Sequence, residues 1–293
     1  MKLGVAGIGK MGAAIATRLI EVGHDVAVWN RTPEKARAVE GAKIAANPAE
    51  LAENSEAVIT ILTDAAALNA VYNSRLGLLH GKVAKKLFID MSTVLPAAEI
   101  ALADAVRAKD AAFVECPVGG STGPARQGKL IGLMGAEPAD AARARPILEQ
   151  LCRRLEHAGP VGSGSVLKFT INLPLMVYWQ ALGEALAMAR AVAIEPERLM
   201  DLLSDTSGAA NVLKVRAPGI ASMLKGGSVG AVTFDVDSAI KDMQSMLAEA
   251  KSRGIELPLV ERTLGCYQEA KQHRSGNAEI STVSVYWAGR DRQ

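Results

Sequence analysis

The stretch Gly7-Ile8-Gly9-Lys10-Met11-Gly12 follows directly after the apolar run Leu3-Gly4-Val5-Ala6 in a chain of 293 residues. A strand that ends in G-x-G-x-x-G and continues into a helix is typical of a dinucleotide-binding turn. The first glycine permits the tight turn, the second admits a pyrophosphate and the third lets the helix pack against the strand. We predict that helix over residues 13–22 and a second strand over 24–29, and we expect all six residues of the stretch to bind a dinucleotide. A glycine-rich turn without a ligand is the alternative, because the chain has 27 glycines.

The end of the predicted second strand indicates which dinucleotide binds. An NAD site places an acidic residue about 20 positions beyond the glycines, where it accepts hydrogen bonds from the ribose hydroxyls. Here the strand ends in Asn30-Arg31-Thr32. Arg31 is able to grip a 2′-phosphate with paired, charge-assisted hydrogen bonds, and Asn30 and Thr32 add neutral donors. We therefore expect NADP(H) to be preferred over NAD(H), with a solvated surface arginine as the alternative interpretation.

The rest of the first half alternates apolar strands with helices. Strands are predicted over residues 57–62, 87–90, 112–116 and 130–134, and helices over 34–40, 47–54, 65–72, 97–108 and 138–151. This pattern predicts an α/β fold with a doubly wound parallel sheet of the Rossmann type, covered on both faces. Ligands of such a sheet collect at the carboxyl ends of its strands.

The pattern changes at the glycine-rich segment 159–164. Beyond it the signals are helical, over residues 166–192, 196–204, 210–224, 234–253 and 258–272, while the tail after Ser275 is left unassigned. We expect an NADP-binding Rossmann domain over residues 1–162 and an all-α substrate and dimerisation domain over 163–293, joined by a long interdomain helix.

Composition argues against several classes of protein. The formal net charge of +2, without a long basic run, offers no electrostatic basis for binding nucleic acid. Cys116, Cys152 and Cys266 are too widely spaced for a disulfide framework or a zinc site, which favours a reducing cytoplasm. Neither a signal peptide nor a membrane span is predicted, because the first strand begins at once and polar residues interrupt the most apolar stretch, residues 166–194.

Three further clusters carry groups suited to chemistry. Ser92 and Thr93 follow a strand end, where their hydroxyls are able to reach a nicotinamide ribose or a substrate; a helix cap before Pro96 is the structural alternative. The glycine-rich segment 117–124 is predicted to form a turn whose backbone N–H groups bind a small carboxylate, with Ser121 and Thr122 as further donors. A purely structural glycine turn is the alternative there.

The third cluster contains Lys168 and Asn172, which share one helix face because they are four residues apart. We predict Lys168 in the first turn of its helix. The dipole disfavours a cation at that end, which suits an acid/base group that must release a proton. A solvated helix lysine is the alternative.

Taken in order, these motifs resemble the β-hydroxyacid dehydrogenase family, which includes 3-hydroxyisobutyrate dehydrogenase and tartronate- and succinic-semialdehyde reductases. The resemblance covers essentially the whole chain. It rests on the first glycine loop, Asp90-x-Ser92-Thr93-x-x-Pro96, the segment 117–130, Gly164-x-x-x-Lys168-x-x-x-Asn172, and Lys241-Asp242-Met243.

The resemblance implies a role for each motif. Lys168 is the general acid/base, and Asn172 holds the substrate or orients Lys168. The substrate carboxylate is bound by Gly119, Gly120 and Ser121. Leu62, Thr63, Thr93 and Lys241 lie along the cofactor. No metal is needed, because the lysine ammonium stabilises the developing alkoxide. The family also implies a homodimer or homotetramer.

Two departures and two rival functions accompany the resemblance. The family usually has Ser-Gly-Gly after Pro-Val, where this chain has Gly119-Gly120-Ser121, and Pro174 is expected to kink the helix that carries Lys168. NADPH-dependent imine reductases resemble this architecture, but they typically carry Asp or Tyr at the lysine position. A non-catalytic dinucleotide-binding interaction module is the second rival; such relatives tend to have lost the lysine. NADPH as cofactor favours reduction of a small semialdehyde or glyoxylate, and the residues do not rank these substrates.

Overall fold

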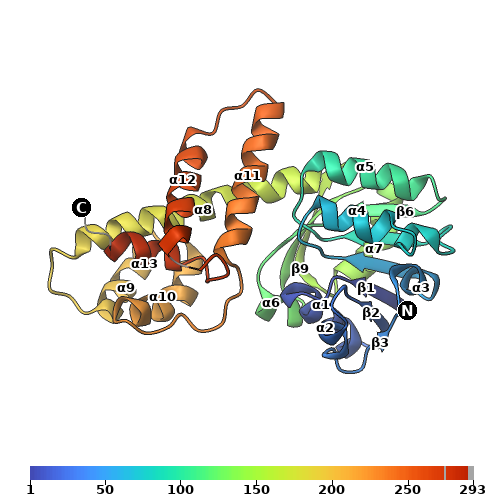
Figure 1. Ribbon diagram of the computed structural model, residues 1–293, viewed down its shortest axis with the longest axis horizontal. Coiled ribbons are helices and arrows are strands. Elements are labelled where there is room, and N and C mark those ends of the chain that lie inside the picture. Colours follow the sequence, from blue (N-terminus) through green and yellow to red (C-terminus); the bar gives the residue numbers. More distant parts are fainter. Residues whose placement is uncertain (274, 290–293) are drawn as a thin grey trace. The chain divides into compact units, whose positions relative to one another are not determined.

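The computed structural model describes residues 1–273 and 275–289 (Figure 1). Its internal contacts divide the chain into two units, residues 1–168 and the residues from Phe169 onward. The division falls within one long helix, α8 (Ser163–Ala189).

The first unit is built on a mostly parallel sheet. β1 (Lys2–Ala6), β2 (Asp25–Trp29), β3 (Lys43–Ile44), β4 (Ala57–Thr60), β5 (Leu87–Asp90) and β6 (Ala112–Glu115) run parallel in the order β3-β2-β1-β4-β5-β6. The order reverses direction beside β1, which is the topological switch point of a doubly wound sheet. The predicted Rossmann-type fold is confirmed.

Helices cover both faces of this sheet. α1 (Lys10–Glu21), α2 (Pro33–Arg37), α6 (Thr122–Arg126) and α7 (Pro138–Leu148) pack on one face. α3 (Pro48–Glu53), α4 (Ala65–Asn73), the 3-10 turn η1 (Leu78–His80) and α5 (Pro96–Arg107) pack on the other. Figure 1 shows α4 and α5 on one side of the sheet and α1 and α2 on the opposite side. The apolar strands β1, β4, β5 and β6 are therefore buried on both faces, which explains their continuous apolar runs.

The far edge of the sheet differs from the prediction of a purely parallel sheet. β8 (Leu130–Gly135) runs antiparallel to β6 and to the short β7 (Val118–Gly119), while β9 (Cys152–Gly159) pairs parallel with β8. The sequence analysis anticipated neither β7 nor β9. β9 carries the exposed arginines Arg153 and Arg154, as an edge strand does, so it lacks the apolar run that identifies a central strand.

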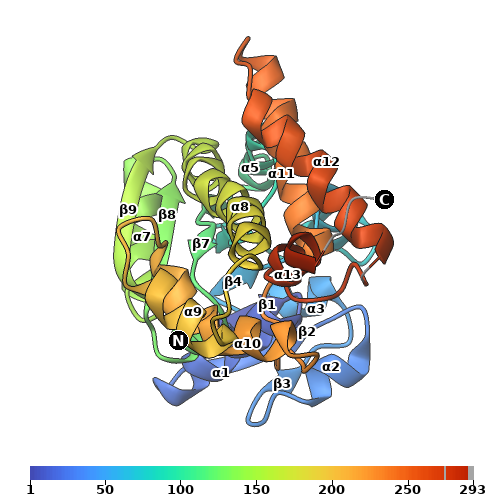
Figure 2. The same cartoon turned by 90° about the vertical axis from the view of Figure 1, so that its left-hand side faces the viewer.

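The elements of the second unit, among its described residues, are helices joined by loops. The rest of α8 is followed by α9 (Pro196–Ser204), α10 (Asn211–Leu224), α11 (Val236–Ser252), α12 (Pro258–His273) and α13 (Thr282–Gly289). Figure 2 shows α11 and α12 packed side by side. α13 lies in the tail that was left unassigned. Among the described residues, none of the helices combines the length and the apolar character that crossing a bilayer requires.

Candidate active site

The glycine loop after β1 has the shape that its sequence predicts. Gly7 has a φ of +97°, and a Cβ there would lie 2.3 Å from the carbonyl oxygen of Ile61. A Cβ on Gly12 would lie 1.9 Å from the carbonyl oxygen of Gly7. Gly9 is the N-cap of α1, and a Cβ there would have no atom within 4 Å. Internal packing therefore requires glycine at positions 7 and 12. The space beside Gly9 is open, and the N-terminus of α1 has no side-chain cap. Both features suit a bound pyrophosphate.

Asn30 fastens this loop to the end of β2. Its Oδ1 accepts a hydrogen bond from the Ile8 backbone N–H at 2.9 Å, and its Nδ2 donates to the Thr32 carbonyl at 3.0 Å. Arg31 and Thr32 are exposed beside it, and Lys10 is exposed at the first position of α1. The sequence analysis treated Asn30 as a donor to the 2′-phosphate, but its amide is already bonded to the loop. Arg31 is then the charged donor that this strand end offers to a phosphate.

The ends of β4 and β5 are joined through Ser92. Its hydroxyl accepts from the Leu62 backbone N–H at 2.9 Å and donates to Asp90 Oδ2 at 3.1 Å. Ser92 is only 1% exposed, while Thr93 is half-buried and Thr63 is exposed. The Ser92 hydroxyl thus positions the loop at Leu62, and Thr93 is the more accessible of the two predicted hydroxyls.

Asp90, which receives these bonds, is fully buried at the end of β5. It also accepts a hydrogen bond from the Thr60 hydroxyl, which in turn is bonded to the Tyr72 hydroxyl. Burial raises the pKa of Asp90, and the donors from Thr60 and Ser92 oppose that shift. The Asp90 side chain thus joins the end of β4 to the end of β5 and to the loop that follows β5.

The glycine-rich segment after β6 is more structured than the predicted turn. Val118 and Gly119 form β7 against β8, and Gly120 then turns the chain with a φ of +124°. Ser121 is the N-cap of the five-residue α6, and Thr122 is its first residue. Part of the segment is therefore a strand that is hydrogen-bonded to β8 and not an isolated turn. An anion bound here would lie between the end of β7 and the start of α6.

Lys168 lies beside this segment. Its Nζ donates to the Val118 carbonyl at 2.8 Å, and the residue is 8% exposed. The prediction that Lys168 occupies the first helical turn was wrong. α8 begins at Ser163, three residues before the predicted start, so Lys168 lies in the second turn. Buried and bonded, Lys168 is not the solvated helix lysine of the alternative interpretation.

Asn172, four residues further along α8, belongs to the second unit, where it meets Asp242 of α11. The Asn172 Nδ2 donates to Asp242 Oδ2 at 3.3 Å, and the Lys241 ammonium pairs with Asp242 Oδ1 at 2.9 Å. Asp242 is 3% exposed. The sequence analysis missed Asp242 as a site residue, although it stands inside the Lys241-Asp242-Met243 motif. α8 continues through Pro174, and the kink expected there stays a prediction.

Glu115, the last residue of β6, is a further buried acid near Lys168 that the sequence analysis did not select. Its Oε1 accepts from the backbone N–H of Gly162 at 2.7 Å and of Gly164 at 2.6 Å. Burial raises the pKa of Glu115 to about 7, although these hydrogen bonds favour the charged form.

The raised pKa of Glu115 predicts a pH-dependent stability. The unfolded chain loses this proton near pH 4.5 and the folded chain near pH 7, so the free energy of unfolding falls as the pH rises between these values. The expected loss is at most about 3 kcal/mol. Urea unfolding of the wild type and of Glu115→Gln across pH 4 to 8 measures it. The difference between them should change over this window, because the other buried acids are present in both proteins; a constant difference contradicts the assignment.

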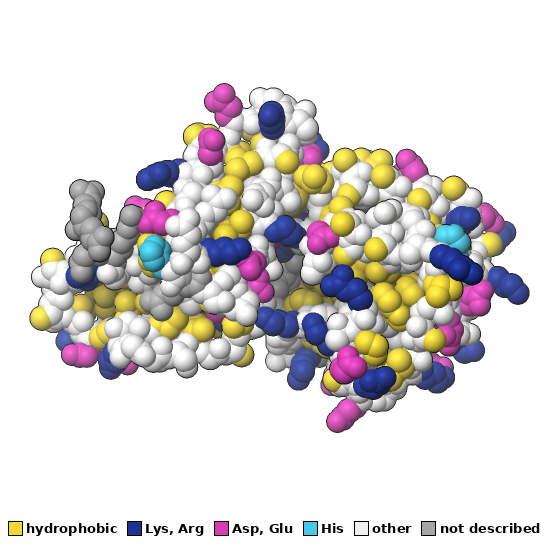
Figure 3. Space-filling view, viewed as in Figure 1, with side chains coloured by type: hydrophobic (Ala, Val, Ile, Leu, Met, Phe, Trp, Pro, Cys, Tyr) yellow, Lys and Arg dark blue, Asp and Glu magenta, His cyan; other side chains and the backbone are white. Residues whose placement is uncertain are grey.

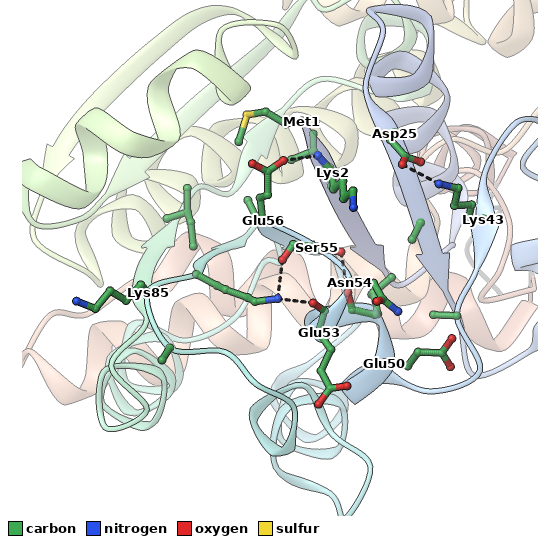
Figure 4. A pocket seen from close by; sticks show the side chains of 18 of the residues that line it. Met1, Lys2, Asp25, Lys43, Glu50, Glu53, Asn54, Ser55, Glu56 and Lys85 are labelled. Atoms are coloured by element: carbon green, nitrogen blue, oxygen red, sulfur yellow. Dashed lines mark hydrogen bonds and ion pairs between the residues drawn. The ribbon is translucent and has the colours of Figure 1, made fainter.

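A cavity of about 880 Å³ lies at the amino-terminal ends of the parallel strands, where β1, β2, β4 and β5 begin (Figure 4). Several of the polar and charged groups that line it already have partners within the protein. Lys43 pairs with Asp25 at 2.7 Å, and the Lys2 backbone N–H donates to the Glu56 carboxylate at 2.6 Å. Because ligands of parallel sheets bind at the carboxyl ends of the strands, we do not assign the site to this cavity.

Charge over the surface is mixed. On the face shown in Figure 3, Lys and Arg side chains are interspersed with Asp and Glu side chains on each unit. Within the described part of the chain, no group of three or more His, Cys, Asp or Glu side chains is arranged to hold a metal ion.

Comparison with known proteins matches both halves of the chain. Residues 2–159 match the NAD-binding domain of 6-phosphogluconate dehydrogenase, and residues 162–286 match the NAD-binding domain of NADP-dependent 3-hydroxyisobutyrate dehydrogenase.

Individual relatives extend over nearly the full length. A 3-hydroxyisobutyrate dehydrogenase of Pseudomonas aeruginosa is 30% identical, covering 97% of this chain and 98% of the relative. Glyoxylate/succinic semialdehyde reductase 1 of Arabidopsis thaliana is 30% identical, covering 97% of both. The crystal structure of a 3-hydroxyisobutyrate dehydrogenase from Salmonella typhimurium superimposes with a TM-score of 0.86 at 23% identity, covering 97% of this chain and 99% of that one.

Proposed function

Because the chain belongs to the β-hydroxyacid dehydrogenase family, we propose that it interconverts a small 3-hydroxyacid and its semialdehyde, or reduces glyoxylate, with NADP(H). The protein is a NAD(P)-dependent oxidoreductase that acts on CH–OH groups. The proposal adds three finer points, which are the preference for NADP(H), Lys168 as the acid/base and a small carboxylate as the substrate.

The environment of Lys168 carries the proposal. Lys168 is 8% exposed as a residue, and its ammonium group is bonded to a backbone carbonyl. Burial of a charged group is costly, so a purely solvated role is disfavoured. Val118, which provides that carbonyl, directly precedes Gly119, the first of the three residues to which the family resemblance assigns the substrate carboxylate. A proton donor beside a carboxylate-binding segment is the arrangement that reduction of an aldehyde acid requires.

Each group of the chain has a separate role in the proposed reaction. The segment Gly119-Gly120, with Ser121 and Thr122, binds the substrate carboxylate. Gly119 pairs with β8, so the donors assigned here are the Gly120 N–H and the groups of Ser121 and Thr122. The Lys168 ammonium stabilises the negative charge that develops on the carbonyl oxygen and delivers its proton to that oxygen. In the reverse direction Lys168 takes the proton of the hydroxyl group. Asn172 orients the substrate, and its own amide is held by Asp242.

The glycine loop fits the dinucleotide. The open space beside Gly9 and the uncapped start of α1 suit a pyrophosphate, and the exposed Arg31 suits a 2′-phosphate. Leu62, Thr63 and Thr93 follow the carboxyl ends of β4 and β5. We assign them, together with Lys241, to the cofactor by the family resemblance. The nicotinamide, when bound, supplies or accepts the hydride.

A substrate panel tests the proposed function. Purified protein is mixed with NADPH, or in parallel NADH, and with succinic, malonic or tartronic semialdehyde or glyoxylate, and the loss of absorbance of the reduced cofactor is followed. We expect turnover of at least one of these acids with NADPH. A simple aldehyde without a carboxylate is the control, and it should react at least about tenfold more slowly because a charge-assisted contact is lost. Equal rates for both would contradict carboxylate recognition.

A further inference from the structure

Glu115 receives four hydrogen bonds from the start of α8. Besides the N–H groups of Gly162 and Gly164, its Oε1 accepts from the Ser165 N–H at 3.4 Å, and its Oε2 accepts from the Ser165 hydroxyl at 2.9 Å. The first N–H groups of a helix have no partner within the helix, so a carboxylate here satisfies donors that would otherwise be buried without a bond. The side chain thereby caps the N-terminus of α8.

The surrounding backbone leaves room for this carboxylate only because two glycines approach it. A Cβ on Gly164 would lie 2.3 Å from the Leu133 carbonyl oxygen and 3.0 Å from Glu115 Oε1. A Cβ on Gly135 would lie 2.2 Å from the same Oε1. Glu115 is completely buried in this space, so it has little freedom to move while the helix start stays in place.

The same short segment also holds the proposed acid/base. Three residues after Glu115, the Val118 carbonyl accepts the hydrogen bond from the Lys168 ammonium at 2.8 Å. We propose that Glu115 is a positioning residue, which caps α8 from the end of β6 and so keeps the Lys168 ammonium at the Val118 carbonyl, beside the glycine segment. This inference rests on the proposed role of Lys168.

The cap does not depend on a negative charge. Three of the four hydrogen bonds go to Oε1, and a proton on Oε2 is able to donate to the Ser165 hydroxyl oxygen instead of accepting from it. A glutamine has the same reach and the same two options, since its Oε1 accepts and its Nε2 donates. An aspartate keeps the charge but is shorter by one methylene group. We therefore expect the function of Glu115 to depend on its reach and not on its charge.

Three substitutions at one position separate reach from charge. Glu115→Gln is expected to retain kcat within about fivefold, whereas Glu115→Asp and Glu115→Ala lower kcat by about 10- to 100-fold, as expected for a displaced catalytic group. The dissociation constant for NADPH should change less than about threefold, because the glycine loop after β1 is untouched. Glu137→Ala is the matched control: Glu137 precedes α7 without capping it through its side chain, so kcat should be unchanged.

Two measurements without cofactor or substrate test the same inference if the proposed function itself fails. Hydrogen exchange of the Gly164 and Ser165 amides should accelerate at least about tenfold in the Asp and Ala variants and stay near the wild-type rate in the Gln variant. Acetylation of Lys168 by acetic anhydride, followed by mass spectrometry, should accelerate in the same two variants. Unchanged exchange and acetylation in both would overturn the inference, and so would a Gln variant as impaired as the Ala variant. Should the Ala variant not fold, the Asp and Gln variants decide between these outcomes.

Discussion

Replacement of Lys168 by alanine is expected to lower kcat by about 10³-fold at neutral pH while NADPH binding survives. The proposed reaction needs a proton at the carbonyl oxygen, and general acid catalysis of this kind contributes about 10²- to 10⁴-fold. The dinucleotide contacts proposed above belong to the glycine loop and to the end of β2, which the substitution does not alter. Steady-state kinetics of the best substrate from the panel, together with the quenching of protein fluorescence on titration with NADPH, measures both quantities.

Lys168→Arg is the matched control for this prediction. Arginine keeps the positive charge and is able to bond the Val118 carbonyl, but it does not release a proton in the accessible pH range. If Lys168 acts by proton transfer, the Arg variant should be nearly as slow as the Ala variant. An Arg variant with wild-type kcat would mean that charge alone suffices, and near-normal turnover in the Ala variant would reject the mechanism.

Arg31→Ala is expected to weaken NADPH binding by about 10- to 100-fold and to leave NADH binding unchanged. A hydrogen-bonded contact to a charged group is worth about 1.5–3 kcal/mol, and only NADPH carries the 2′-phosphate. The exposed position of Arg31 directly after the amide that holds the glycine loop supports this assignment. Dissociation constants of both dinucleotides, measured by calorimetry at a fixed salt concentration, give the change in preference.

Lys35→Ala is the control for the charge of this region. Lys35 is an exposed cation on α2, four residues from Arg31, so its loss removes one positive charge without removing the strand-end guanidinium. We expect it to change NADPH affinity less than about threefold, since exposed charges are well screened. Equal losses from both variants would indicate a general electrostatic effect, and a wild-type protein that prefers NADH would refute the NADP(H) proposal.

Much of the architecture is readable from local patterns. The glycine loop between an apolar run and a helix, followed by repeated apolar strands, predicts the doubly wound sheet, and the structure confirms it. These signals are local because a strand buried on both faces must be apolar along its length and a tight turn needs glycine. β9 escaped prediction for the same reason: it is an edge strand with exposed charges, so no local signal marks it.

The chain by itself therefore determined the fold class, the family and the set of residues able to take part in dinucleotide and carboxylate chemistry. The tertiary structure decided which of these groups are already occupied. Asn30 is bonded to Ile8, Ser92 to Leu62 and Asp90, and Glu115 to a helix about 50 residues away. Such bonds join segments that only the folded sheet brings together, and a buried polar group must find its partner wherever the fold places one. The spacing of residues in the sequence does not indicate which partner a buried polar group will have. The hydrogen bonds that Glu115 accepts from the start of α8 could therefore be identified only from the structure.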